Sequence, residues 1–129
     1  MVCVSSFDAS SAYLAYMTTP IDPGAAGGID LDSEIIVDLA RECPNLAGVK
    51  LTCGNVGKLT RICSSVSGGS FATEFPRKNE AFPFLVLGGY SDFLLPSAFS
   101  SAHGAITGLA NIAPVRISRL ILSKFFQIC

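Results

Sequence analysis

Lys50 is the residue whose type and position most suggest chemistry. It is the only charged residue in the apolar run from Leu46 to Thr52, which Pro44 precedes and Gly54 follows. Such a run is typical of a buried strand in a parallel sheet, where desolvation disfavours an ammonium and lowers the pKa of a lysine. An unprotonated lysine amine can attack a carbonyl carbon and form a Schiff base. The residues alone leave a second interpretation equally open, in which a strand-end lysine reaches solvent or pairs with a carboxylate such as Asp92.

The segment that follows this run, Gly54–Thr60, lies where a phosphate-binding loop would lie. It comes after a strand and opens a helix, but Thr52 and Leu59 occupy the positions where a P-loop needs a glycine and a hydroxyl. We therefore interpret it as a tight strand-to-helix turn, and we expect Lys58 and Arg61 on the solvated face of the helix.

The sequence offers no recognisable donor set for a metal ion. His103 is the only histidine, and the five cysteines are widely spaced without a C-x-x-C pair. We expect His103 in a loop before Gly104, reduced thiols as in the cytoplasm, no metal site and no cofactor.

Helical and strand patterns alternate from about residue 30 onward, and these elements must position Lys50. An N-cap signal at Asp30–Glu34 and apolar residues at helical spacing predict a helix that ends before Pro44. Further helices are expected over 55–68, 93–102 and 114–126, and strands over 46–52, 81–87 and 104–109. This alternation predicts an α/β fold with a parallel sheet, either as staves of a barrel or as a doubly wound sheet.

The first 19 residues show neither period, and Pro20 and Pro23-Gly24 then interrupt the chain. We expect residues 1–19 to be a poorly ordered segment outside a single domain over 20–129.

Composition narrows the class of protein. The chain has 129 residues, enough for one core, with 15% charged and 50% hydrophobic residues and a net charge of −1. No apolar stretch approaches the roughly 18 residues of a membrane span, and no basic face or targeting signal is evident. We predict a cytoplasmic protein that binds neither nucleic acid nor a membrane. We also expect part of its apolar surface to remain exposed in the isolated chain.

Four motifs in order are similar to the C-terminal part of the dihydrodipicolinate synthase family. They are Gly48-Val-Lys50, Gly88-Gly89, Gly104-Ala-Ile106 and Ala110-Asn-Ile-Ala113. The stretches Pro23–Asp32 and Lys50–Arg61 especially resemble the fungal aldolase-type members of the family. The resemblance covers roughly residues 22 to 114. It implies a partial (β/α)₈ barrel that contains about strands six to eight with their helices.

The resemblance also implies roles for three residues. Lys50 would form a Schiff base with pyruvate or a related 2-oxo acid, Gly89 would line the site at the seventh strand, and Ile106 would contact the bound acid at the eighth. All three would lie at or near carboxyl ends of strands, where barrel active sites are built. The full-length family also implies a homo-oligomer.

The chain departs from the family pattern before Lys50. The family carries Tyr-Asn-x-Pro-Gly at the end of its fifth strand, with the tyrosine as proton relay, but Pro20–Gly24 stands there. Tyr16 lies four residues too early, and an extended chain would displace it by more than about 12 Å. Strands one to four and the hydroxyl pair that binds the carboxylate are also missing. Ala25 replaces an arginine of the synthase proper, which favours an aldolase of 4-hydroxy-2-oxoglutarate or of sugar acids.

The sequence therefore predicts a Schiff-base-forming class I lyase or aldolase for pyruvate-type 2-oxo acids, in a truncated form whose activity is in doubt. An alternative is a non-catalytic fragment that acts as an interaction module with a homologous subunit. A third interpretation is an ordinary doubly wound domain with a solvent-facing Lys50.

Overall fold

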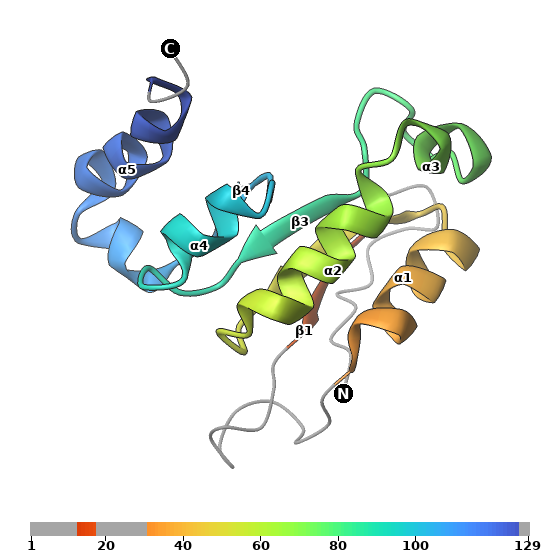
Figure 1. Ribbon diagram of the computed structural model, residues 1–129, viewed down its shortest axis with the longest axis horizontal. Helices are drawn as coiled ribbons and strands as arrows, with labels where there is room; N and C mark the ends of the chain where they lie inside the picture. The colour runs from red at the N-terminus through yellow and green to blue at the C-terminus, as the bar shows by residue number, and fades with distance from the viewer. Residues whose placement is uncertain (1–12, 18–30, 127–129) are drawn as a thin grey trace.

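The computed structural model describes residues 13–17 and 31–126, with side chains over residues 31–120 (Figure 1). The elements follow in the order β1 (Tyr13–Met17), α1 (Ser33–Glu42), β2 (Leu46–Leu51), α2 (Val56–Val66), α3 (Gly69–Glu74), β3 (Leu85–Gly88), α4 (Leu94–Phe99), β4 (Gly104–Ala105) and α5 (Pro114–Phe126). A 3₁₀ turn covers Gly108–Asn111. The strands form one four-stranded sheet in the order β1-β2-β3-β4, and every neighbouring pair is parallel. The predicted α/β class with a parallel sheet is confirmed.

Strand β1 corrects the prediction for the N-terminal segment. Tyr13–Met17 pairs with β2 along its length, although no strand was expected before residue 20. A strand added at a sheet edge is held by main-chain hydrogen bonds, and these do not require apolar and polar residues to alternate. The remaining residues up to 12, and the break around Pro20 and Pro23, lie outside the described part of the chain.

Side-chain caps begin both long helices on the helix-covered side of the sheet. Asp32 accepts hydrogen bonds from the backbone N–H groups of Glu34 and Ile35 at 3.0 and 2.9 Å, and Asn55 accepts one from Lys58 at 2.9 Å. These bonds satisfy donors that the helix itself leaves unpaired. Both caps confirm the helix starts that the sequence predicts.

Helices α1 and α2 lie side by side across one face of the sheet (Figure 1). Val49, Leu51 and Val86 are almost fully buried, and they meet the apolar side of the two helices. The other members of this core are Ile36, Val37, Ala40, Leu46, Leu59, Ile62, Cys63, Val66, Phe71, Phe84 and Phe93. Because side chains alternate along a strand, Gly48 and Lys50 belong to the opposite face.

The structure places Lys58 differently from the sequence prediction. It was expected on the solvated helix face, but only 4% of it is exposed, and its Nζ donates a hydrogen bond to the Leu31 carbonyl at 2.9 Å. A buried ammonium needs such a partner, and the chain before α1 supplies it. Arg61, in contrast, is exposed, and its Nε donates to the Ser33 hydroxyl at 2.8 Å.

The C-terminal half follows the predicted alternation with shorter elements. Strand β3 begins at Leu85 rather than at 81, and β4 ends at Ala105 rather than at 109, where the chain turns into the 3₁₀ segment. Helix α3 was not predicted, whereas α5 has the expected bounds. In Figure 1, α5 lies at the opposite end of the molecule from α3. Within the described residues, no helix has the length and apolar character needed to cross a membrane.

Candidate active site

Lys50 lies one residue before the carboxyl end of β2 and is half-buried. Its backbone neighbours are Tyr16 on β1 and Leu87 on β3. Since Val49 and Leu51 are buried against the helices, the face of the sheet that carries Lys50 is the one those helices leave uncovered. The predicted strand is confirmed, and the lysine is less buried than the apolar run suggested.

Gly89 directly follows β3 and is buried against the end of β2. A Cβ added here would lie 2.5 Å from Thr52 Cγ2 and 2.6 Å from the Leu51 carbonyl oxygen. Only a glycine lets the two chain segments approach this closely. Gly89 therefore brings the loop after β3 against the segment that carries Lys50.

Ile106 follows the short strand β4, with 39% of its surface exposed. Its N–H donates to the Gly88 carbonyl at 2.9 Å, so the backbone ladder continues one residue beyond β4. Lys50, Gly89 and Ile106 thus lie at or just beyond the carboxyl ends of three adjacent strands, as the sequence predicts. Ligands of parallel α/β proteins bind at this edge of a sheet.

A hydroxyl pair ties together the loops at this edge. The Ser91 hydroxyl donates to the Thr107 hydroxyl at 3.0 Å, and Thr107 is buried. Sequence reasoning missed this pair, because the two residues are far apart along the chain and hydroxyls in loops are common. Thr52 follows β2 directly, two residues after Lys50, and this spacing is the one sequence signal that could have indicated it.

The amino-terminal end of the sheet carries a different set of polar groups. Buried Arg77 donates hydrogen bonds to four backbone carbonyls, those of Ala40, Cys43, Leu46 and Phe75. Burial lowers the pKa of this guanidinium from its ordinary value, but arginine remains charged in proteins. Its partners are main-chain atoms, so Arg77 holds loops and strand ends in place.

The His103 side chain is also hydrogen-bonded to main chain. Its Nδ1 accepts a hydrogen bond from the Val86 backbone N–H at 3.1 Å, and the backbone N–H of His103 donates to the Val86 carbonyl at 2.9 Å. Burial lowers the pKa of this imidazole. It lies in the loop before Gly104, as predicted. Across the described residues, His, Cys, Asp and Glu side chains form no group of three or more that could hold a metal ion.

Sequence comparison relates this arrangement to known enzymes, although no family model matches the chain. It is 39% identical over 98 residues to a protein of Coccidioides immitis (strain RS) provisionally named 4-hydroxy-2-oxoglutarate aldolase, mitochondrial; this match covers 76% of the chain and 27% of that protein. It is 38% identical over 101 residues to an L-threo-3-deoxy-hexylosonate aldolase of Aspergillus niger, with 71% and 30% covered.

Structural comparison gives the same relationship. A crystal structure of a dihydrodipicolinate synthase family protein from Coccidioides immitis superposes with a TM-score of 0.57 at 35% identity, covering 88% of this chain and 30% of that one. The chain belongs to the dihydrodipicolinate synthase family. A monomeric dihydrodipicolinate synthase variant matches with a TM-score of 0.66 at 20% identity, covering 87% and 32%, and so supports the fold.

Family membership shows which larger fold the sheet belongs to. The four parallel strands and their helices match part of a dihydrodipicolinate synthase barrel. The chain spans less than a third of the length of the relatives described above. The sheet that carries Lys50 therefore corresponds to only a part of the barrel that the full-length family forms.

Proposed function

We propose that this chain carries the lysine of a Schiff-base-forming class I lyase or aldolase, whose substrate is a pyruvate-type 2-oxo acid. The observation that carries the proposal is the position of Lys50, near the carboxyl end of a parallel strand on the face that α1 and α2 do not cover. Relatives named as 4-hydroxy-2-oxoglutarate and deoxy-hexylosonate aldolases support this class of substrate.

The chemistry begins with the lone pair of the Lys50 Nζ. It forms a C–N bond to the ketone carbon, the carbonyl oxygen departs as water after accepting two protons, and a C=N bond remains. The protonated imine withdraws electrons from the neighbouring carbon, so a carbon–carbon bond to that carbon can break or form. The electron sink is the imine itself, and we propose no cofactor.

Gly89 and Ile106 shape the space around this lysine in the proposal. The missing side chain at Gly89 lets the ligand and the main chain approach closely, and the exposed Ile106 offers an apolar surface to the carbon chain of the acid. We assign β2, β3 and β4 to strands six, seven and eight of the family's barrel. Within the aldolases, Ala25 favours 4-hydroxy-2-oxoglutarate or sugar acids over the substrates of the synthase.

Borohydride trapping tests the proposal. The purified chain is incubated with pyruvate and sodium borohydride, and the reduced adduct is located by peptide mass spectrometry. We expect label at Lys50, no label at exposed Lys78 in the same sample, and no label in Lys50→Met. Unlabelled Lys50 in a folded chain, or equal label at both lysines, would contradict the assignment.

A second candidate function rests on the sheet face that carries Lys50. Leu85 and Leu87 are only partly buried there, and Phe82 and Ile106 are exposed. This apolar face fits a non-catalytic module that pairs with a homologous subunit. Analytical ultracentrifugation with and without a full-length aldolase of the family distinguishes the two. A complex without trapping at Lys50 would favour the module, whereas trapping in the isolated chain would favour the enzyme.

Assembly and location remain predictions. We propose a homo-oligomer, as the resemblance implies, with no nucleic-acid or membrane partner. We also keep the cytoplasmic location, although the name of the Coccidioides relative contains the word mitochondrial. Cell fractionation decides between the two compartments.

A further inference from the structure

The order of the strands places the crossover helices on one side of the sheet. The strands follow one another as β1-β2-β3-β4 and are all parallel, and right-handed connections between consecutive strands put every crossover helix on the same side. Helices α1 and α2 lie on that side (Figure 1). Helix α4 joins them, because a Cβ added at Gly88, which shares a face with Val86, would lie 2.9 Å from Ser97 Oγ. This is the topology of a barrel, since the strand order of a doubly wound sheet reverses and its helices cover both faces.

The other face of the sheet is apolar and lacks a covering layer within the described residues. Parallel sheets occur almost only with both faces covered. Here Leu85 and Leu87 are only partly buried, and 39% of Ile106 is exposed. Beside Leu85 lies a hollow of about 220 Å³ that is also lined by Ala47 and Phe82, and 61% of Phe82 is exposed. This face therefore has the character of a barrel interior that has not been closed.

These 129 residues cannot supply the missing layer themselves. The segments outside the described part of the chain hold 12, 13 and 3 residues. A strand–helix–strand unit takes roughly 30 residues, so none of these segments is long enough for even one such unit. The covering layer must come from another polypeptide.

A second copy of this chain has the strands that closure requires. Eight parallel strands close a barrel whose interior is just wide enough for side chains to fill, and each copy has four. Strands β1 and β4 are the two ends of the described sheet. With a two-fold axis along the barrel, β4 of each copy meets β1 of the other in the same parallel orientation as the pairs within a copy. We propose that two copies of this chain pair in this way and close one eight-stranded barrel.

The helix layer offers matching surfaces for the same arrangement. Helices α1 and α5 lie at opposite ends of the molecule (Figure 1), and closure brings α5 of one copy against α1 of the other. Both helices have exposed apolar residues: Ile35 on α1 is 45% exposed, and Val115 and Leu120 on α5 are 61% and 39% exposed. The side of α1 that faces α2 is instead polar and carries Glu34 and Asp38. The apolar residues at the two ends of the layer would cover each other in the dimer.

Closure would also complete the surroundings of Lys50. Strand β2 is second in each copy, so the two Lys50 residues lie four strands apart, on opposite sides of one barrel interior and near its carboxyl mouth. Each copy then gives the other's lysine the opposite wall of a site, and this wall excludes water from it. The assembly itself does not depend on the proposed function, whereas this role of the partner copy rests on it.

Sedimentation equilibrium of the 129-residue chain tests the assembly. We expect a species of twice the chain's 13.5 kDa that dissociates on dilution. Leu87→Glu should weaken dimerisation by about 100-fold or more, because it buries a carboxylate without a partner. Ile35→Glu, at an exposed position that tolerates the change, should weaken it by about 10-fold. Val56→Glu is the matched control, since exposed Val56 begins α2 in the middle of the helix layer, and it should dimerise as the wild type does. Circular dichroism confirms that each variant is folded.

Hydrogen exchange distinguishes a closed barrel from two stacked faces. In a closed barrel the peptides that contain β1 and β4 gain protection as the protein concentration rises, because their open edges become paired. Stacked faces leave exchange at both edges unchanged. A folded monomer at all concentrations, unprotected edges in the dimer, equal weakening by Val56→Glu, or binding to a full-length relative alone would overturn the proposal. A dimer without borohydride label at Lys50 would overturn the proposed function and leave the assembly, whereas a labelled monomer would do the reverse.

Discussion

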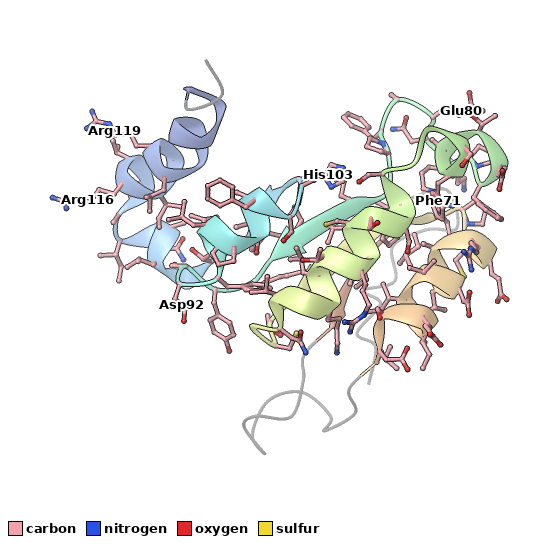
Figure 2. All side chains as sticks on the ribbon, in the orientation of Figure 1. Phe71, Glu80, Asp92, His103, Arg116 and Arg119 are labelled. Atoms are coloured by element: carbon pink, nitrogen blue, oxygen red, sulfur yellow. The ribbon has the colours of Figure 1, made fainter. Side chains whose placement is uncertain are left out.

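The two ends of the sheet use polar side chains in opposite ways. Figure 2 shows Phe71 and Glu80 near the amino-terminal end of β3, and Asp92 beyond its carboxyl-terminal end. At the first end, buried Arg77 is hydrogen-bonded to main-chain carbonyls from three segments. At the second end, Lys50 is half-buried on the face of the sheet that the helices leave uncovered. It lies beside the close contact between Gly89 and Thr52.

This contrast teaches which end maintains the fold and which end is open to a ligand. A charged group whose donors all meet backbone oxygens is fixed in place and contributes to stability. A charged group at the carboxyl edge, next to the close contact that Gly89 allows between two segments, can meet a substrate. Barrels of parallel strands divide stability and chemistry between their two ends in the same way. Three predictions test the division.

The largest effect on stability is expected at Arg77. Arg77→Met leaves the carbonyls of Ala40, Cys43, Leu46 and Phe75 without the guanidinium and should lower the free energy of unfolding by about 3 kcal/mol or more. The loss also removes the contact between the guanidinium and the Phe84 ring. Urea denaturation measures the change. Lys78→Met, at an exposed neighbour, should stay within about 0.5 kcal/mol. A loss below about 1 kcal/mol at Arg77 would show that the amino-terminal end does not depend on this residue.

An intermediate effect is expected at the carboxyl edge. Gly89→Ala places a methyl group against Thr52 and the Leu51 carbonyl, so the ends of β2 and β3 must separate, at a cost of about 1–3 kcal/mol. Trapping at Lys50 should fall as well, because the shifted segment carries the lysine. Gly69→Ala is the control, since nothing lies within 4 Å of the added carbon. Normal trapping and stability in Gly89→Ala would mean that this contact does not position the site.

The smallest effect is a pH dependence at His103. Burial lowers the pKa of this imidazole in the folded state, so the unfolded chain binds the proton more readily. Its contribution to stability is full above the unfolded pKa of about 6.5 and is lost progressively as the pH falls below that value. Urea denaturation between pH 7.5 and 5.5 should show this loss, and His103→Gln should reduce the slope. An unchanged slope would assign the dependence to other groups, since the chain has no second histidine.

Local signals accounted for much of the fold. Asp32 and Asn55 fixed the starts of α1 and α2, and the apolar run around Lys50 became β2, because caps and hydrophobic runs act over a few neighbouring residues. Strand β1 was not predicted, and Lys58 was predicted on the solvated face although it is buried. Both depend on partners distant in sequence, the edge of β2 and the carbonyl of Leu31, which no local pattern contains.

The sequence by itself determined the alternation of strands and helices, the family motifs, and a lysine within an apolar strand. Tertiary structure alone decided that Lys50 lies on the face away from α1 and α2 and that Gly89 packs against Thr52. It also decided that Tyr16 is the backbone partner of Lys50 on the neighbouring strand. The physical reason is that register between strands is set by main-chain hydrogen bonds and by the burial of one face, and both belong to the assembled sheet.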